Sequence, residues 1–159
     1  MSEIRRLASV CLHRYFALCD RPRRVGQTSY GDLFSANAIW EGVGGRYAER
    51  FGRFEGRDAI AGAMRLALDE TPSYRFNLHL LTNELWMPGS ALTGAWLLQQ
   101  FSVLNDERAI EATAEIRVTF DVAGGAVTIA RFRTRNLMWR EAVDGIGENA
   151  DLAGLEELS

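Results

Sequence analysis

The stretch AIEATAEIRVTFD, residues 109–121, alternates hydrophobic and polar side chains along its whole length. A period of two is typical of a β-strand that has one face against a core and the other face outside. One face carries Ile110, Ala112, Ala114, Ile116, Val118 and Phe120, and the other carries Glu111, Thr113, Glu115, Arg117 and Thr119. We therefore expect a long strand that is buried on one side only.

Three more strand-like stretches surround this one. They are residues 75–87, 91–104 and 126–140, and the intervening turns are Pro88-Gly89, Asn105-Asp106 and Gly124-Gly125. Short turns of these residue types join strands that run in opposite directions. The second half of the chain therefore predicts a four-stranded antiparallel meander.

Two helices are predicted before the meander. Apolar residues recur at steps of three and four from Ile4 to Cys19, which is the stripe of an amphipathic helix. Pro22 should end this helix near Asp20, and a second helix should run from Asp58 to Asp69. Helices that precede a meander must cover one side of its sheet, so the predicted class is α+β.

The segment between the two helices has weaker signals. Residues 30–34 suit a helical turn or two, and residues 38–43 alternate like a strand. The glycines at 42, 44 and 45 and the stretch 53–55 indicate a hairpin-like excursion before the second helix.

The size and composition fit one compact domain. The chain has 159 residues, of which 47% are hydrophobic and 25% charged, enough for a core without disulfide or metal staples. We assign residues 1–140 to this domain and 141–159 to an acidic tail, which has six acidic residues and no basic one. Three states of the tail stay open: a mobile end, a short helix on the body, or a flap over a cavity.

The charge pattern argues against several function classes. The net charge is -3 and the sequence pI is about 5.5, so no basic face is expected for nucleic acid. All 18 basic residues are arginines, which excludes Schiff-base chemistry and a lysine base. No run of 18 apolar residues and no signal-peptide core is present, so we expect no membrane partner and a cytoplasmic location.

The cysteines and histidines do not form a metal set. Cys11 and Cys19 lie about 12 Å apart along one predicted helix, too far for a disulfide. The two histidines are distant in sequence, so the four residues make no recognisable zinc pattern. We therefore expect no metal and no cofactor.

Asp20 and His79 are the main candidates for catalysis. Asp20 ends a helix, where the helix macrodipole opposes a carboxylate, and such a conflict hints at function. His79 lies in a strand whose same side carries Asn77, Leu81, Asn83 and Leu85. If the two side chains meet, the acid sets the imidazole tautomer and supports its positive form, which makes His79 a proton-abstracting base.

A structural alternative remains for each of the two residues. Asp20 can pair in solvent with Arg21, Arg23 or Arg24. His79 can be a hydrogen-bonded structural histidine without a part in chemistry. The residue pattern by itself does not separate these alternatives from catalysis.

In order of elements and in several stretches, the chain resembles the SnoaL-like branch of the nuclear transport factor 2-like superfamily. The stretches are RYFALCD (14–20), DLF (32–34) with AIW (38–40), FEGRDAI (54–60) and HLLTN (79–83). The resemblance covers about residues 3–140 and implies a cone-shaped α+β barrel, in which a curved, mainly antiparallel sheet wraps around N-terminal helices and an apolar pocket.

The scytalone dehydratase and dehydrochlorinase branch is the most similar part of that superfamily. Its members place an aspartate after the first helix and a histidine on the first long strand, which Asp20 and His79 match. Tyr15 matches a position where such enzymes often have a polar pocket residue. The resemblance thus implies a catalytic set of His79, Asp20 and Tyr15, although Tyr15 lies on the apolar stripe and packing is its equal alternative.

The resemblance implies a cofactor-independent lyase of the dehydratase type that acts on a hydrophobic cyclic or aromatic molecule. The expected pocket residues are Trp40, Tyr47, Asn83, Trp96, Phe101 and Met138. The alternatives are a polyketide cyclase or isomerase that uses the same pair, and a binding module without catalysis.

Two expectations concern the sheet surface. Dehydrochlorinase-like enzymes use a basic residue on a late strand, and Arg117, Arg131, Arg133 and Arg135 are candidates for it. The arginine row also fits a solvated or salt-bridged surface. Because related cones associate through the outer face of the sheet, we expect a homo-oligomer, a dimer or a trimer.

Overall fold

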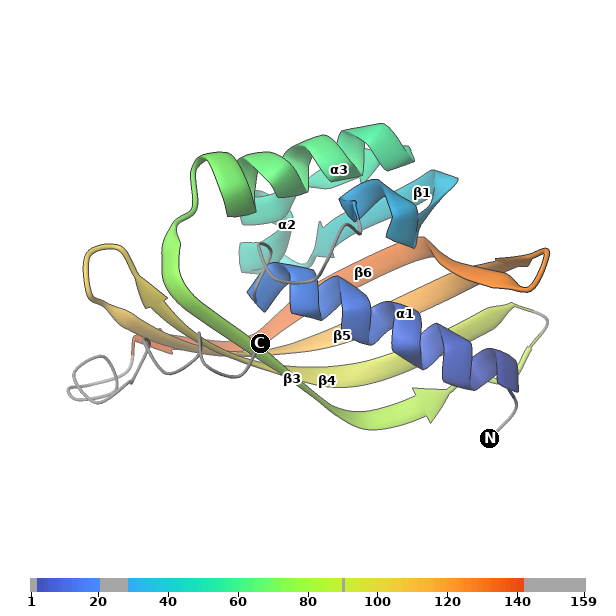
Figure 1. Ribbon diagram of the computed structural model, residues 1–159. Coiled ribbons are helices and arrows are strands. Elements are labelled where there is room, and N and C mark those ends of the chain that lie inside the picture. The colour runs from blue at the N-terminus through green and yellow to red at the C-terminus, as the bar shows by residue number, and fades with distance from the viewer. Residues whose placement is uncertain (1–2, 21–28, 90, 142–159) are drawn as a thin grey trace, which may run out of the picture.

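The computed structural model describes residues 3–20, 29–89 and 91–141, and they form an α+β fold (Figure 1). The helical elements are α1 (Glu3–Asp20), the 3₁₀ turn η1 (Tyr30–Leu33), α2 (Gly45–Phe51), α3 (Arg57–Arg65) and the π-helical turn η2 (Leu66–Glu70). The strands are β1 (Phe34–Val43), β2 (Arg53–Glu55), β3 (Tyr74–Trp86), β4 (Leu92–Leu104), β5 (Ala109–Ala123) and β6 (Ala126–Glu141). The predicted fold class is confirmed.

The six strands form one curved sheet in the order β2-β1-β6-β5-β4-β3. Strands β3 to β6 are the expected antiparallel meander, whereas β1 joins β6 in parallel. The sheet does not close, since β2 and β3 are its two edges. The molecule is therefore an open cone rather than a complete barrel.

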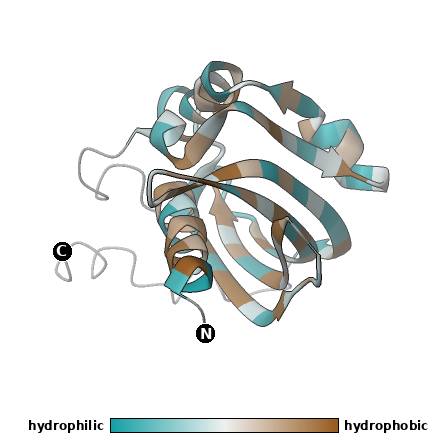
Figure 2. Cartoon of the chain, turned by 90° about the vertical axis from the view of Figure 1, so that its right-hand side faces the viewer, coloured by the Kyte–Doolittle hydropathy of each residue, from teal (hydrophilic) through white to brown (hydrophobic). Residues whose placement is uncertain are grey.

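The concave face of the sheet holds the core. Helix α1 lies across it and contacts β3 and β6, while α2 and α3 pack against β1 (Figure 1). The apolar stripe of α1, with Ala8, Leu12 and Phe16 all buried, meets Ile116 and Phe132 in one cluster. Figure 2 shows hydrophobic and hydrophilic residues alternating along the curved strands, as expected for a sheet with one buried face.

A short helix replaces the simple hairpin expected between β1 and β2. These strands do pair in antiparallel fashion, but the seven residues of α2 lie between them. Gly42 permits this arrangement because a Cβ there would lie 2.2 Å from the carbonyl oxygen of Tyr47. A helix this short has too few turns to produce a readable period.

Of the register shifts in the sheet, two change the face on which predicted pocket residues and their neighbours lie. The register of β3 shifts between Thr82 and Leu85, and Asn83 there has a φ of 55°. The register of β5 with β6 shifts between Asn136 and Met138. Each bulge adds one residue and reverses the alternation beyond it. As a result Trp86 and Trp139 join the concave side, while Leu85 and Met138 turn outward.

Among the helices of the described residues, none has the length and hydrophobicity needed to span a membrane.

Candidate active site

The structure brings Asp20 and His79 together across a separation of 59 residues in the chain. Oδ1 of Asp20 lies 2.5 Å from Nδ1 of the His79 ring, and Oδ2 accepts the His79 backbone N–H at 3.1 Å. The side chains of His79 and Asp20 are only 9% and 13% exposed. The carboxylate therefore holds both the main chain and the ring of His79 in a mostly enclosed position.

The secondary structure explains how these groups meet. Asp20 is the last residue of α1, and α1 crosses the sheet with its end beside β3. The amide of Asn77 donates to the carbonyl oxygen of Cys19 at 3.5 Å, and Phe16 lies 5.1 Å from the His79 ring. Two donors from His79 offset the unfavourable position of the carboxylate at a helix C-terminus. The alternative partners Arg21, Arg23 and Arg24 lie outside the described residues.

The contact decides the tautomer of the imidazole. An ionised carboxylate can only accept hydrogen bonds, so Nδ1 of His79 must donate its proton to Asp20. The lone pair of a neutral ring then lies on Nε2. Within the described ranges no hydrogen-bond partner is found for Nε2. The contact thus leaves the second ring nitrogen with the lone pair that a general base uses.

A polar cluster beside His79 was not identified from the sequence. Gln100 lies directly opposite His79 in the sheet, and its amide nitrogen donates to Asn77 and Ser102, at 2.9 Å in each case. The Ser102 hydroxyl donates to Asn77 at 2.7 Å and is 2% exposed. A signal was present, because Gln100 and Ser102 interrupt the apolar series of Trp96 and Leu98 on one face of the strand.

Tyr15 and Trp40 are joined to each other rather than to His79. The indole N–H of Trp40 donates to the Tyr15 hydroxyl at 2.9 Å, and the Trp40 ring stacks on Phe132. Burial raises the pKa of Tyr15 well above its ordinary value, the Cys19 thiol raises it further, and the bond from Trp40 lowers it by less. Tyr15 therefore remains a neutral phenol, and its hydroxyl contacts both the Trp40 indole and the Cys19 thiol.

Tyr47, Trp96 and Asn83 occupy different environments. Tyr47 is 5% exposed and lies beside Asn136 on the concave side; burial raises its pKa more than this contact lowers it. Trp96 is a buried core residue whose N–H donates to Glu84 at 3.3 Å. Asn83 lies in the exposed bulge of β3. Tyr47 therefore brings a phenol hydroxyl to the concave side, as expected for a pocket residue.

Glu84 ties one end of α1 to the sheet. Its carboxylate accepts bonds from the Ser9 hydroxyl at 3.2 Å and the Trp86 indole at 2.8 Å, in addition to Trp96. Arg5 also lies over the Trp86 ring. This cluster is far along the strand from His79, and the sequence pattern gave no indication of it.

The structure places Phe101 and Met138 on the outer face of the sheet. Phe101 is opposite Glu111 and follows Gln100, which shares a face with His79. Met138 is opposite Thr113 and is 47% exposed. Met138 points outward because of the bulge in β6, since without the extra residue it would lie on the same side of the sheet as Asn136. Neither side chain is brought to the dyad.

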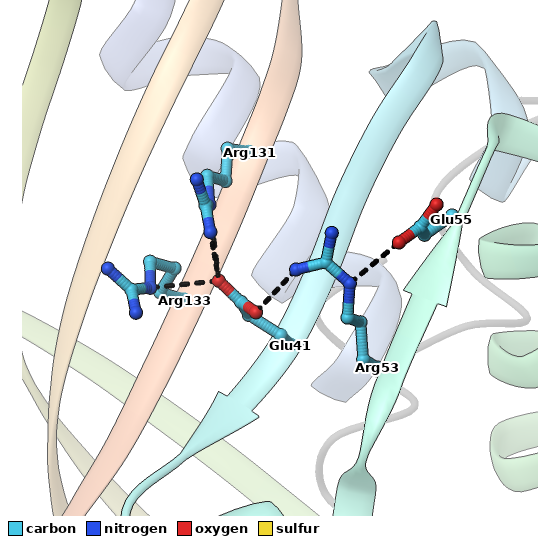
Figure 3. Close-up of polar contacts among 5 residues, drawn as sticks. All are labelled: Glu41, Arg53, Glu55, Arg131 and Arg133. Carbon is cyan, nitrogen blue, oxygen red and sulfur yellow. Dashed lines mark hydrogen bonds and ion pairs between the residues drawn. The ribbon is translucent and has the colours of Figure 1, made fainter.

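The late-strand arginines also point outward, and two of them bind a single glutamate (Figure 3). Glu41 Oε1 accepts from Arg131 at 2.7 Å and lies 2.9 Å from Nε of Arg133, which makes an ion pair there without hydrogen-bond geometry. Oε2 accepts from Arg53 at 2.8 Å. Arg131 and Arg133 therefore hold a buried carboxylate within the chain.

The remaining arginines of this row share the same face. Arg117 is opposite Arg133, and Arg135 is opposite Glu115, which shares the outer face with Arg117. None of the four arginines considered as a basic residue for the pocket reaches the concave side. Within the described ranges, no group of three or more His, Cys, Asp or Glu residues is arranged to hold a metal ion.

Comparisons of the sequence found no match to a protein-family model or to a curated protein. Comparisons of the structure found close likenesses. A type-2 hexachlorocyclohexane dehydrochlorinase (LinA) has a TM-score of 0.71 at 16% identity, with 91% of this chain and 95% of that chain covered. The type-3 LinA dehydrochlorinase from Novosphingobium barchaimii LL02 has a TM-score of 0.69 at 15% sequence identity, with 91% of this chain and 97% of that chain covered.

A third likeness comes from a scytalone dehydratase-like protein of Novosphingobium aromaticivorans DSM 12444. Its TM-score is 0.67 at 14% identity, and 88% of each chain is covered. At such low identities the likeness concerns the fold, and its coverage extends over nearly the whole length of each neighbour. The chain therefore shares the α+β fold of these solved structures, which is the fold that the resemblance in its sequence implies.

Proposed function

We propose that this protein is a cofactor-independent lyase of the dehydratase type, in which His79 removes a proton from a carbon atom of a hydrophobic cyclic or aromatic compound. The observation that supports this most directly is the double contact of Asp20 with His79, at 2.5 Å to the ring and 3.1 Å to the backbone. Such a contact is what a proton-abstracting histidine needs for a defined tautomer and orientation. The solved structures with the same fold include dehydrochlorinases.

The proposed reaction is an elimination. Nε2 of His79 takes the proton, and the C–H electron pair forms a double bond to the neighbouring carbon. The leaving group, hydroxide in a dehydration, departs from that carbon with its own electron pair. Asp20 stays ionised throughout and stabilises the imidazolium that forms. General-base assistance of this kind contributes about 10²–10⁴-fold to a rate.

Neutral hydroxyl donors are available for charge that develops on the substrate. Tyr15 keeps its proton because burial raises its pKa. Trp40 occupies an acceptor position of its oxygen, and the O–H exchanges its contact with the Cys19 thiol for the substrate. Tyr47 is a second buried phenol with a raised pKa on the concave side. A donor in an enclosed site stabilises a developing oxyanion more strongly than water does. We assign Tyr15 this role and Tyr47 the role of a pocket residue.

The proposal includes the partners and the location expected from the sequence. The substrate is a hydrophobic small molecule, and the protein is a cytoplasmic homo-oligomer that self-associates through the outer face of its sheet. Leu80, Leu85 and Met138 on that face are 43%, 62% and 47% exposed, which leaves apolar area for a second copy to cover. Sedimentation equilibrium checks this, and a monomer at all concentrations contradicts it.

Turnover in heavy water tests the proposed reaction across a range of candidate substrates. The protein is incubated in D₂O with a panel of hydroxylated and halogenated ring compounds, and products are followed by mass spectrometry. Loss of water or hydrogen halide identifies an elimination, whereas deuterium uptake without loss of mass identifies an isomerase. We expect His79→Gln to reduce the elimination at least 100-fold, at the lower end of the range for a general base.

His13→Gln is the matched control. His13 is exposed on α1 and its Nδ1 lies 2.7 Å from the Ser9 carbonyl oxygen. The control should retain full turnover. Equal turnover by His79→Gln and the wild-type protein on a compound that loses water would refute the assignment of His79 as the base.

A further inference from the structure

A hollow of about 420 Å³ opens at one end of the concave face. It lies where β3 begins, β4 ends and β6 approaches its last residues, next to α2. Its lining is Arg46, Arg50, Ser73, Leu104, Asn105, Asp106, Arg108, Ile110 and Trp139. Asp20 and His79 are not part of this lining, so the hollow is a separate feature of the same face.

Two arginines on α2 are held in place at this hollow. The guanidinium carbon of Arg46 lies 3.7 Å from the centre of the Trp139 ring, a cation–π contact that holds the side chain against the indole. Arg50 donates to the Tyr74 hydroxyl at 2.8 Å. The two residues are four positions apart on one helix, so their side chains are neighbours. They form a pair of positioned cations on one wall.

The charges of these two arginines are not neutralised by a carboxylate. In the part of the chain that the structure describes, neither Arg46 nor Arg50 forms an ion pair with Asp or Glu. Arg108, which also lines the hollow, differs, since it binds Asp106 at 2.8 Å and Glu141 at 2.6 Å. The hollow therefore has an excess of positive charge that comes from α2.

The hollow and the dyad lie on one continuous face. Along β3 and β4, Tyr74 is opposite Leu104, Asn77 is opposite Ser102, and His79 is opposite Gln100. Leu104, which lines the hollow, and Gln100 are four positions apart on β4, so their Cα atoms are about 13 Å apart at the ordinary rise of a strand. The polar cluster of Asn77, Gln100 and Ser102 occupies the interval. A ligand that reaches from the hollow to His79 is therefore an elongated molecule.

We infer that Arg46 and Arg50 bind an anionic oxygen group of the substrate, so that the substrate class is an elongated hydrophobic compound with an acidic group well separated from its reacting carbon. This rests on the proposed function for the reacting carbon, but the anion site itself does not depend on the dyad. The Trp139 ring forms part of the wall beside the acidic group.

Two dyes with the same ring system test the inference. Anilinonaphthalene sulfonate carries an acidic group and N-phenylnaphthylamine does not. Fluorescence titration gives the dissociation constant of each dye for the wild-type protein and for the double variant Arg46→Gln, Arg50→Gln. We expect the wild type to bind the sulfonate dye about tenfold more tightly than the neutral dye, since charge-assisted bonds of this kind contribute a decade or more. The double variant should lose this preference and keep its affinity for the neutral dye.

The double variant Arg117→Gln, Arg135→Gln is the control, because it removes the same charge from the outer face. This outer-face variant should still prefer the sulfonate dye. In the wild type and in this variant, the preference should become smaller at high salt. The inference is overturned if the wild type has no preference, if the α2 variant keeps it, if the outer-face variant loses it equally, or if neither dye binds.

The outcome separates this inference from the proposed reaction. If His79→Gln leaves elimination unchanged while the dye preference still depends on Arg46 and Arg50, the lyase proposal fails and the anion site stands. If His79→Gln abolishes elimination and the α2 variant keeps its dye preference, the anion site fails and the lyase proposal stands.

Discussion

Replacing Asp20 with asparagine should reverse the tautomer of His79. The wild-type carboxylate accepts two hydrogen bonds from His79, one from the ring and one from the backbone N–H. Asparagine has one acceptor oxygen and one NH₂ donor. The backbone N–H can only donate, so it should keep the oxygen. The NH₂ group then faces Nδ1, which must become an acceptor, and the ring proton moves to Nε2.

The contacts give the size of the effect. The substitution replaces a charge-assisted bond between groups that are 9% and 13% exposed, and bonds to charged groups contribute about 1.5–3 kcal/mol. We expect the free energy of unfolding to fall by about 2 kcal/mol. Because the Nε2 lone pair is lost, turnover should fall by about 10²–10⁴-fold, the whole contribution of a general base.

The tautomer can be measured without a substrate. The chain has two histidines, so ¹⁵N-histidine labelling gives a two-bond ¹H–¹⁵N spectrum with few signals, and His13→Gln assigns them. At mildly alkaline pH the wild type should show His79 protonated on Nδ1, and Asp20→Asn should show it protonated on Nε2. A wild-type His79 that carries its proton on Nε2 would refute the reasoning.

Asp32→Asn is the matched control for this experiment. Asp32 is exposed, and its carboxylate accepts the backbone N–H of Ser29 at 3.1 Å in a helix cap. Its replacement makes the same chemical change at a distance from His79. We expect a loss of about 0.5–1 kcal/mol, as for a helix cap, and no change in the spectrum of His79.

Three further predictions concern stability and reactivity. Burial raises the pKa of Glu41, but its three arginine partners together hold this pKa below its usual range. Glu41→Gln should therefore lower the free energy of unfolding by about 1–2 kcal/mol at neutral pH, a modest value because the arginines are partly exposed to solvent. The pKa of Glu41 is lower in the folded than in the unfolded protein. The stabilisation by this carboxylate is therefore complete above the ordinary glutamate pKa of about 4.3 and is lost as pH falls through the folded pKa. Urea unfolding of the wild type and the variant from neutral to acidic pH checks this. Burial raises the pKa of the Cys11 thiol to about 11, so Ellman's reagent at neutral pH should label Cys11 only after unfolding, and rapid labelling of the native protein would contradict this. Gly42→Ala places a Cβ 2.2 Å from the Tyr47 carbonyl oxygen and should destabilise the protein by about 3 kcal/mol. Gly62→Ala, inside α3, should instead stabilise the protein by about 0.5–1 kcal/mol. Equal melting temperatures of the two variants would contradict this contrast.

Periodicity predicted the elements well where they are long. The stretch 109–121 corresponds to β5, and the other three predicted strands begin and end within one residue of β3, β4 and β6. The first helix ends at Asp20 as expected. The second predicted helix ends near residue 69, where the structure has an α-helix followed by a π-helical turn. Short or parallel pieces were not predicted, namely α2 and the pairing of β1 with β6.

The candidate site shows a sharper division. Asp20 and His79 could be selected from residue type and resemblance, and the structure places them in contact. In the sequence Trp139 is only one of several bulky residues, and Gln100 was not predicted to lie near the site. Phe101 and Met138 were expected in the pocket, but they lie on the outer face.

The sequence alone determined which residues alternate, where the long strands and the first helix lie, and which side chains have the chemistry of a base and its acid. Only the tertiary structure decided which face of the sheet is concave, how a bulge in β6 moves Trp139 inward and Met138 outward, and that Asp20 meets His79. The physical reason is the range of the interactions. A period of two or of 3.6 is a local property of the chain, whereas the register of a sheet and the contact of groups 59 residues apart depend on how all the elements pack together.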